Sequence, residues 1–272
     1  MKIIPMANAL PKSGTNLLQK LFELMGYKYD RLGIAESLIL GKIYPMRQLI
    51  RGAKFDKNPL HIGFYSPVAV SSRWLLRRIK RVKRGGYISG HANYSERLNY
   101  ILEKYKVKVV HIIRDPRDVL VSHAHFFAKK KDYFLYPLFS NLSFEDRIKI
   151  TLNGGFYEEI GLHLNSFSYA LENVLMWKKS NNCLIVKFED LIGEKGGGSK
   201  EKQMETIESI LIFLKRKDLL NEIEELADKL YGGTHTFRKG KKETWKEELS
   251  TKLKKEIHDS IGNLIIELGY EI

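Results

Sequence analysis

Residues 3 to 16 read IIPMANALPKSGTN, and this stretch decides the fold. Its apolar first part predicts a buried β-strand over residues 3 to 10. The next segment, residues 16 to 26, carries apolar side chains at helical spacing and ends at a glycine, which predicts an α-helix. The turn between them, residues 11 to 15, therefore opens the positive end of a helix, where phosphate groups bind. Its lysine precedes its single glycine, unlike the G-x-x-x-x-G-K-[ST] phosphate loop.

Three further apolar segments predict strands that run into polar turns: residues 87–91, 107–113 and 184–188. Helical periodicity covers residues 95–105, 116–128, 144–152, 165–179, 201–215, 218–231 and 250–268. Strands that alternate with helices predict a single α/β domain over residues 1–272, in which helices flank a central parallel β-sheet. Ligands of such a sheet bind at the carboxyl ends of its strands.

Residues 30 to 85 have weak periodicity and hold many Pro, Gly, aromatic and charged residues. We expect a loop-rich layer there that covers the active site. Within it, residues 77 to 84 (RRIKRVKR) form the densest positive run of the chain. Such a run predicts a solvated helical face, and a substrate-binding or surface-binding patch is the alternative.

The composition is that of a globular protein with an acidic partner. Of its 272 residues 43% are hydrophobic, and no apolar run approaches the roughly 18 to 20 residues of a membrane span. The net charge of +14 favours nucleotides, nucleic acid, anionic lipid or an anionic substrate. The single Cys183 forms no internal disulfide and suits a reducing compartment, so we expect a cytoplasmic protein. We reject a signal peptide at residues 2–10, because its cleavage would remove the first strand.

Four groups of residues in the turns can bind an anion or move a proton. Lys12 adds a full charge to the backbone N–H groups of the first turn. Arg114 ends a strand, with Ser122 two helical turns later, and can grip a phosphate. The run at 238–240 (RKG) supplies two adjacent cations, and His91 ends another strand. Each group alone also has a structural explanation: a capped helix, a salt-bridged turn, a solvated loop or a core histidine.

The order and spacing of these groups resemble the soluble, cytosolic-type sulfotransferases that use 3′-phosphoadenosine-5′-phosphosulfate (PAPS). The resemblance rests on the PKSGT loop, a histidine 23 residues before the strand-end arginine, a serine eight residues after it, and a late FRKG…W. It runs from about residue 3 to 270 and includes FED at 188–190 and LGY at 268–270, the latter common in bacterial members. Residues 30–85 match poorly. The resemblance implies a P-loop-nucleotide-kinase-like fold.

By this resemblance, the residues that bind the 5′-phosphosulfate of PAPS are Lys12, Ser13, Gly14, Thr15 and Asn16. The residues that match those binding the 3′-phosphate of PAPS are Arg114, Ser122, Arg238, Lys239 and Gly240. The residues that match the adenine-contacting segment are Thr234, Thr236 and Phe237. The catalytic base matches His91, and no metal site is predicted.

The implied reaction moves the sulfuryl group of PAPS to a hydroxyl or amine of a small-molecule acceptor, with adenosine 3′,5′-bisphosphate (PAP) as the product. His91 takes the acceptor proton, while Lys12 stabilises the departing phosphate oxygen. Several positions depart from the family pattern, among them the late motif, which reads RKGKKETW at 238–245 in place of R-K-G-x-x-G-D-W. Asn16-Leu17 replaces the Thr-Trp that stacks on adenine in mammalian members. Ser89 replaces a frequent lysine two residues before the histidine, which removes one cation from the transfer site.

Two other functions stay open at this point: a P-loop-type small-molecule kinase, and a basic PAP-binding or nucleic-acid-binding protein without catalysis. No recognised nucleic-acid module is found, so we expect no specific nucleic-acid partner. A hydrophobic or aromatic acceptor would suit the aromatic residues Tyr44, Phe55, Phe64, Tyr65, Tyr133, Phe134 and Phe139. The oligomeric state is open, with a homodimer among the alternatives.

Overall fold

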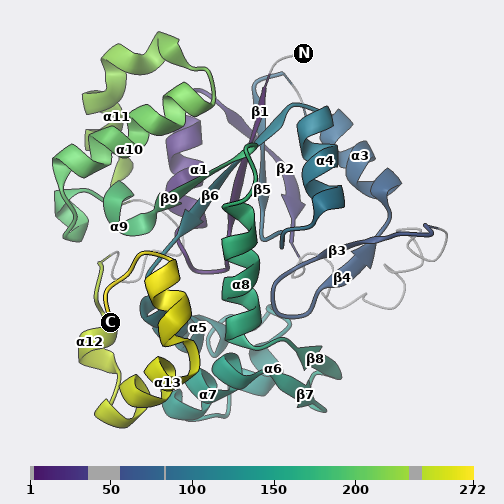
Figure 1. Cartoon of the computed structure of the whole chain (residues 1–272), viewed down its shortest axis with the longest axis vertical. Helices are drawn as coiled ribbons and strands as arrows, with labels where there is room; N and C mark the ends of the chain where they lie inside the picture. The colour runs from purple at the N-terminus through teal and green to yellow at the C-terminus, as the bar shows by residue number, and fades with distance from the viewer. Residues whose placement is uncertain (1–2, 36–55, 83, 233–240) are drawn as a thin grey trace.

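The protein is built on a five-stranded parallel β-sheet (Figure 1). The computed structural model describes residues 3–35, 56–82, 84–232 and 241–272. The strand order is β2-β5-β1-β6-β9, and each neighbouring pair is parallel. The strands are β1 Ile4–Ala9, β2 Lys28–Ile34, β5 Gly86–Gly90, β6 Val107–Ile113 and β9 Cys183–Lys187. Because β1 is the central strand, the loop that follows it opens at the middle of the carboxyl edge.

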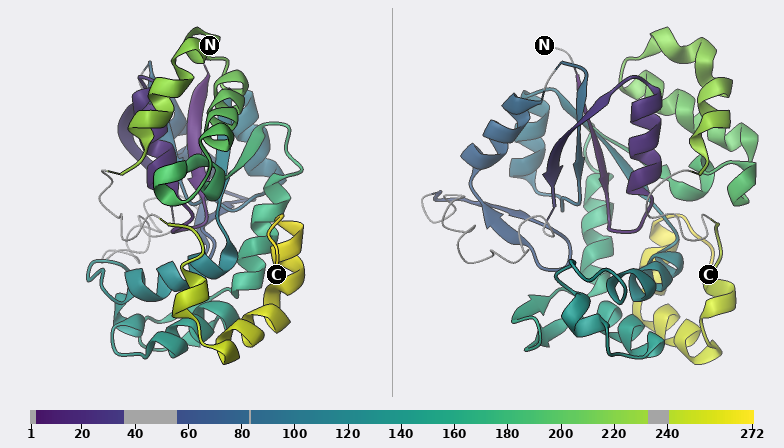
Figure 2. Two further views of the ribbon diagram at one scale, coloured as in Figure 1. Left: turned by 90° about the vertical axis from the view of Figure 1, so that its left-hand side faces the viewer. Right: turned by 180° about the vertical axis from the view of Figure 1, so that it is seen from behind.

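Helices cover the sheet and continue past its carboxyl edge (Figures 1 and 2). Those packed beside the strands are α1 Thr15–Leu24, α3 Ser72–Arg81, α4 Glu96–Lys104, α8 Phe167–Trp177, α9 Phe188–Leu191, α10 Lys200–Phe213 and α11 Ile223–Leu230. Those beyond the edge are α5 Pro116–Phe127, α6 Tyr136–Phe139, α7 Phe144–Asn153, α12 Trp245–Glu248 and α13 Thr251–Glu267. The remaining elements are the hairpins β3 Leu60–Ile62 with β4 Val68–Val70 and β7 Gly155–Tyr157 with β8 Leu162–Leu164, and the 3-10 helices η3 Glu194–Gly196 and η4 Lys217–Glu222.

Strand β1 shows how the sequence builds two cores. Ala7 and Ala9 pack on one face of the sheet with α1, α10 and α11, whereas Met6 packs on the other face with α3 and α4. Successive side chains of a strand point to opposite faces, so a strand that is covered on both sides reads as a continuous apolar run. A third core lies beyond the carboxyl edge and joins α5, α7, α8 and α13. The three cores therefore hold the elements that meet at this edge.

The predicted α/β class, with helices that flank a parallel sheet, is confirmed. The helix predicted over 218–231 is divided into η4 and α11. The described part of residues 30–85 holds most of β2, the β3–β4 hairpin and α3, and the loop-rich layer expected over the whole stretch stays a prediction. Cys183 is half-buried on β9. None of the described helices is long and apolar enough to cross a membrane.

Candidate active site

The phosphate loop, residues 11–16, leaves the N-terminus of α1 open to an anion. Gly14 precedes α1 with a φ of 109° and makes no side-chain cap. A Cβ on Gly14 would lie 2.7 Å from the ring of Phe188, so both the backbone conformation and the close packing require glycine. Thr15 Oγ1 is buried and has no hydrogen-bond partner among the described residues. The N–H groups of the first helical turn and this hydroxyl can therefore bind a phosphate.

Lys12 brings a full positive charge to the phosphate loop. Its Nζ lies 4.2 Å from the centre of the Phe126 ring, a cation–π contact with α5. Its φ of 69° lies in the left-handed region, which residues other than glycine seldom adopt. Burial lowers the pKa of both His91 and His123, and the charge of Lys12 lowers each further. The ammonium group therefore acts on two neighbouring imidazole rings.

His91 directly follows β5 and is oriented by β1. Its Nδ1 lies 2.8 Å from the carbonyl oxygen of Ala9, and its backbone N–H donates to the carbonyl oxygen of Ile34 at 2.8 Å. A carbonyl oxygen only accepts hydrogen bonds, so Nδ1 carries the proton and Nε2 keeps its lone pair. Burial lowers the pKa of His91, against the hydrogen bond to Ala9, which raises it. The ring is therefore neutral at pH 7, with Nε2 able to accept a proton.

Asn8 connects β1 to the residue that follows His91. Its Oδ1 accepts from the Ala92 N–H at 2.8 Å, and its Nδ2 donates to the Ala92 carbonyl oxygen at 2.9 Å. The same Nδ2 lies 3.0 Å from Nδ1 of His111, a buried ring whose pKa burial lowers to about 3. Asn8 is missing from the predicted site residues, although a polar side chain inside a buried strand must find partners. Its contacts fix the backbone beside His91.

Arg114 directly follows β6 and lies at the same carboxyl edge. Its Nη2 donates to the Lys241 carbonyl oxygen at 3.0 Å and lies 3.4 Å from the Asp118 carboxylate. Its guanidinium lies 4.8 Å from the centre of the Phe188 ring, which also packs against the phosphate loop. Arg114 Nε is buried and has no partner within the described ranges. Ser122 is half-buried on α5, two turns beyond Arg114.

Asp118, a fully buried carboxylate on α5, anchors the chain that follows residues 233–240. Its Oδ1 accepts from the Thr244 hydroxyl at 2.7 Å and from the Trp245 N–H at 3.0 Å. Its Oδ2 accepts from the Glu243 N–H at 2.9 Å. Asp118 is also absent from the predicted site, because the groups that donate hydrogen bonds to its carboxylate lie more than 120 residues away in the sequence. It fixes this chain beside the strand-end arginine.

Lys20 holds the chain that precedes the same segment. Its Nζ donates to the Gly232 carbonyl oxygen at 2.8 Å. Lys20 lies on α1 and Asp118 on α5, so both flanks of residues 233–240 are attached to helices that begin at the site. The predicted contacts that lie outside the described residues are Thr234, Thr236, Phe237, Arg238, Lys239 and Gly240.

The FED and LGY motifs meet at Glu189. Its Oε1 accepts from the Asp115 N–H at 2.9 Å, and its Oε2 accepts from the Tyr270 hydroxyl at 2.9 Å. Asp115 caps the N-terminus of α5. Burial raises the pKa of Glu189, against the lowering effect of these hydrogen bonds. The contact joins the start of α5 to the chain that follows α13.

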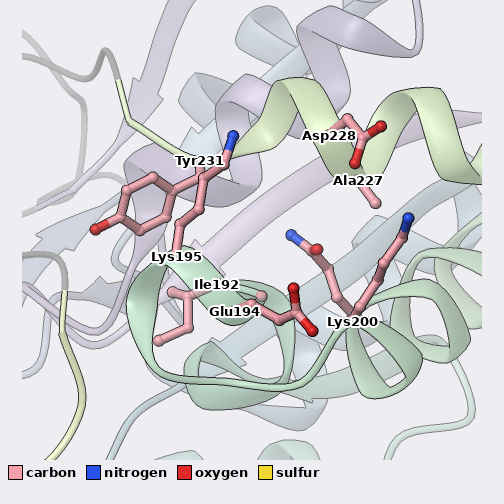
Figure 3. Close-up of a pocket in the computed structure, with 9 residues that line it drawn as sticks. Ile192, Glu194, Lys195, Lys200, Ala227, Asp228 and Tyr231 are labelled. Carbon is pink, nitrogen blue, oxygen red and sulfur yellow. The ribbon is translucent and has the colours of Figure 1, made fainter.

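A separate small pocket lies between α10 and α11 (Figure 3). Its polar lining includes Lys195, Lys200, Gln203, Asp228 and Tyr231. None of the predicted site residues in the described part of the chain lines it. The candidate active site is therefore the carboxyl edge of β1, β5 and β6, not this pocket.

The sequence matches the family model described as "Sulfotransferase domain" over residues 6–269. The chain belongs to this family. The resemblance identified in the sequence is thereby confirmed at the level of the family. A curated relative, the luciferin sulfotransferase of Photinus pyralis, is 28% identical over 116 residues. That region covers 42% of this chain and 30% of the relative.

Solved structures agree with the sulfotransferase fold. A mouse sulfotransferase complexed with PAP superposes with a TM-score of 0.57 at 17% identity, over 96% of this chain and 85% of that one. Retinol dehydratase in complex with retinol and PAP gives a TM-score of 0.60 at 17% identity, over 100% of this chain and 83% of that one. At this level of identity the likeness shows the fold, which agrees with the predicted P-loop-like architecture.

This sulfotransferase fold brings several of the predicted site residues to one edge. The phosphate loop follows β1, His91 follows β5, and Arg114 follows β6. These three strands are neighbours in the sheet, with β1 in the middle. The roles assigned to the residues by resemblance stay predictions, and the following two experiments examine parts of them.

The first prediction concerns the titration of His91 in the ligand-free protein. Its imidazole should titrate below pH 6.5, because burial and the Lys12 charge both disfavour the protonated form. A ¹³C NMR titration, with His91→Asn to assign the signal, measures this midpoint. The acidic limb of kcat/KM for PAPS, which reports groups of the unliganded enzyme, should fall in the same range. A midpoint at or above 6.5 would contradict this environment.

The second prediction concerns Asp118→Asn. The new amide places a donor against the Glu243 N–H, and Arg114 loses its charged neighbour. We expect the free energy of unfolding to fall by about 1–3 kcal/mol, and the affinity for PAP to fall by about tenfold or more because the anchored chain moves. Urea unfolding and calorimetry measure the two effects. The exposed Asp132→Asn is the matched control. Unchanged stability and PAP affinity would show that Asp118 does not anchor this chain.

Proposed function

We propose that this protein is an enzyme that transfers the sulfuryl group of PAPS to a hydroxyl or amine of a small-molecule acceptor. The observation that carries the proposal is the state of His91, which is neutral, hydrogen-bonded through Nδ1 and within the field of Lys12. A base with Nε2 available and a cation on the phosphate loop are the two groups that sulfuryl transfer needs. Family membership supports the same reaction.

The proposed reaction step is an in-line displacement at sulfur. His91 Nε2 takes the proton of the acceptor hydroxyl or amine, and the acceptor oxygen or nitrogen forms a bond to sulfur. The bond between sulfur and the 5′-phosphate oxygen breaks, and its electron pair stays on that oxygen. Lys12 and the N–H groups at the start of α1 stabilise the negative charge that develops there. The products are the sulfated acceptor and PAP.

The chain's own residues fit the two phosphate ends of PAPS. Thr15 Oγ1, which is buried and has no partner in the described part of the chain, and the uncapped start of α1 suit the 5′ end. Arg114, whose Nε is likewise unpartnered among described residues, suits the 3′-phosphate together with Ser122. No group of three or more His, Cys, Asp or Glu side chains in the described ranges is placed to bind a metal ion.

We propose a hydrophobic or ring-bearing acceptor. Phe126 lies against Lys12, the Tyr133 ring contacts Phe126, and the Phe134 ring contacts Tyr133; all three rings are partly buried. Of the other aromatic residues that the sequence suggests for the acceptor, Phe64, Tyr65 and Phe139 are buried in the cores, while Tyr44 and Phe55 lie outside the described residues. Solved retinol dehydratase structures hold retinol or androsterone, which supports an apolar acceptor in this fold. We further propose that the chain forms a single domain that acts in the cytoplasm. Analytical ultracentrifugation would determine whether it forms a homodimer.

Calorimetry with PAP and ATP tests the proposed co-substrate. We expect PAP to bind at least about tenfold more tightly than ATP, with an affinity that EDTA does not change, because the 3′-phosphate has its own ligands. Arg114→Gln should remove this preference by weakening PAP more than ATP. Tight binding of ATP that requires Mg²⁺, with weak binding of PAP, would instead indicate a kinase.

A further inference from the structure

Two buried side chains outside the predicted site, Tyr65 and His123, form a chain of hydrogen bonds that ends on the phosphate loop. Tyr65 follows β3 and is 3% exposed, and His123 on α5 is fully buried. The Tyr65 hydroxyl lies 3.1 Å from Nδ1 of His123. Nε2 of His123 lies 2.8 Å from the carbonyl oxygen of Pro11. These two contacts link the β3–β4 hairpin, α5 and the loop.

The direction of both hydrogen bonds follows from the Pro11 carbonyl oxygen, which only accepts. Nε2 of His123 therefore carries the proton, and Nδ1 accepts from the Tyr65 hydroxyl. Burial lowers the pKa of His123 to about 3, so the ring is neutral at physiological pH. The Pro11 carbonyl oxygen and the Tyr65 hydroxyl thus both favour the His123 tautomer that is protonated at Nε2.

The Pro11 carbonyl belongs to the same peptide plane as the N–H of Lys12. That plane sets the φ of Lys12, which is 69°. For a residue other than glycine, such a backbone conformation is strained and persists only where its surroundings hold it. On the other side of Pro11, the Ser13 N–H donates to the Leu10 carbonyl oxygen at 3.1 Å. This backbone bond and the contact of His123 with Pro11 therefore both hold the strained turn.

The same helix also contacts the far end of the Lys12 side chain. Phe126 lies three residues after His123 on α5, and its ring lies 4.2 Å from Lys12 Nζ. Tyr65 is in turn fixed by Asn165, whose N–H donates to the Tyr65 carbonyl oxygen at 2.7 Å. His123 and Phe126, on one face of α5, thus contact the backbone before Lys12 and its ammonium group, respectively.

We propose that Tyr65 and His123 are positioning residues for Lys12: the Tyr65 hydroxyl orients the His123 ring, and the ring holds the Pro11–Lys12 peptide plane so that the ammonium points at the breaking bond. This inference rests on the proposed sulfuryl transfer. Neither side chain takes part in the chemistry, so their loss should act on kcat rather than on the binding of PAPS.

Steady-state kinetics with PAPS and an acceptor that the wild type sulfates test the proposal with four variants. Tyr65→Phe removes one oxygen atom and should lower kcat by about tenfold, with the KM for PAPS changed by less than about twofold. His123→Leu should lower kcat by about 10²-fold, as expected for a misplaced catalytic group. His123→Gln can place an amide N–H near the Nε2 position and should recover most of that loss. Tyr157→Phe, which loses a hydroxyl bonded to the Gly154 carbonyl oxygen, is the control and should match the wild type.

The outcomes separate this inference from the proposed function. If the wild type sulfates no acceptor, the proposed function fails. If the wild type turns over and Tyr65→Phe equals it, or if Tyr65→Phe raises the KM for PAPS while kcat is unchanged, the positioning role is overturned. Equal rates for His123→Gln and His123→Leu would also overturn it, because the ring N–H would then be dispensable. Should His123→Leu fail to fold, Tyr65→Phe decides the question.

Discussion

Replacing His91 by asparagine should lower kcat by about 10²- to 10⁴-fold, the usual contribution of a positioned general base. Asparagine can keep the local structure, because its amide N–H can donate to the Ala9 carbonyl oxygen as Nδ1 of His91 does at 2.8 Å. It has no group that accepts a proton near neutral pH. The change therefore removes the proton-accepting group and keeps the hydrogen bond to the Ala9 carbonyl oxygen. The loss is measured by incubating the variant with PAPS and an acceptor and quantifying the sulfated product by mass spectrometry.

Two controls separate a catalytic from a structural role for His91. PAP affinity by calorimetry should stay within about twofold of the wild type, because the base does not hold the nucleotide. His258→Asn changes an exposed histidine on α13 and should keep full activity. Full turnover in His91→Asn would refute the assignment of the base. Loss of PAP binding in the same variant would indicate that His91 supports the loop rather than the reaction.

Replacing Lys12 by methionine should lower kcat by about 10²- to 10³-fold, or about 3–4 kcal/mol in the barrier, which is typical for one preorganised group that meets developing charge. Methionine keeps a long apolar side chain against Phe126, where Lys12 Nζ lies 4.2 Å from the ring centre. It removes the positive charge. The effect should be large because Ser89 stands where family members frequently carry a second lysine.

The division between kcat and KM decides how Lys12 acts. A group that stabilises only the transition state lowers kcat and kcat/KM equally, whereas one that binds ground and transition states alike raises KM. We expect mainly the first pattern, with a smaller loss of PAP affinity. Lys252→Met, at an exposed position of α13, is the control. A normal kcat with a raised KM for PAPS would show that Lys12 binds the nucleotide and does not assist the departing oxygen.

The sequence predicted most of the sheet and the phosphate loop because their signals are local. β1 and β6 are covered on both faces and read as mainly apolar runs, and the turn after β1 shows Lys12, Gly14 and the start of a helix within a few residues. The sheet edge was harder to predict. β2 changes register against β5 between Tyr29 and Gly33, which breaks the alternation that identifies a strand.

The residues that hold the site in place could not be predicted from local patterns. Asn8 contacts Ala92, 84 positions away. His123 contacts Pro11, 112 positions away, and Lys20 contacts Gly232, 212 positions away. Such partners are set by the three-dimensional packing, so a single sequence shows only that a buried polar side chain needs some partner. The anion-binding residues of the phosphate loop are thus visible in the sequence, whereas the distant residues that hold the site in place are visible only in the structure.

Incubation with PAPS and a panel of hydrophobic phenols, alcohols and amines, in EDTA and with detection by mass spectrometry, tests the central claim most directly. We predict a sulfated acceptor and an equimolar amount of PAP for the wild type, with both products reduced by at least about 10²-fold in His91→Asn. PAPS that stays intact with every acceptor, or a phosphorylated product formed from ATP in a parallel reaction with Mg²⁺, would contradict it.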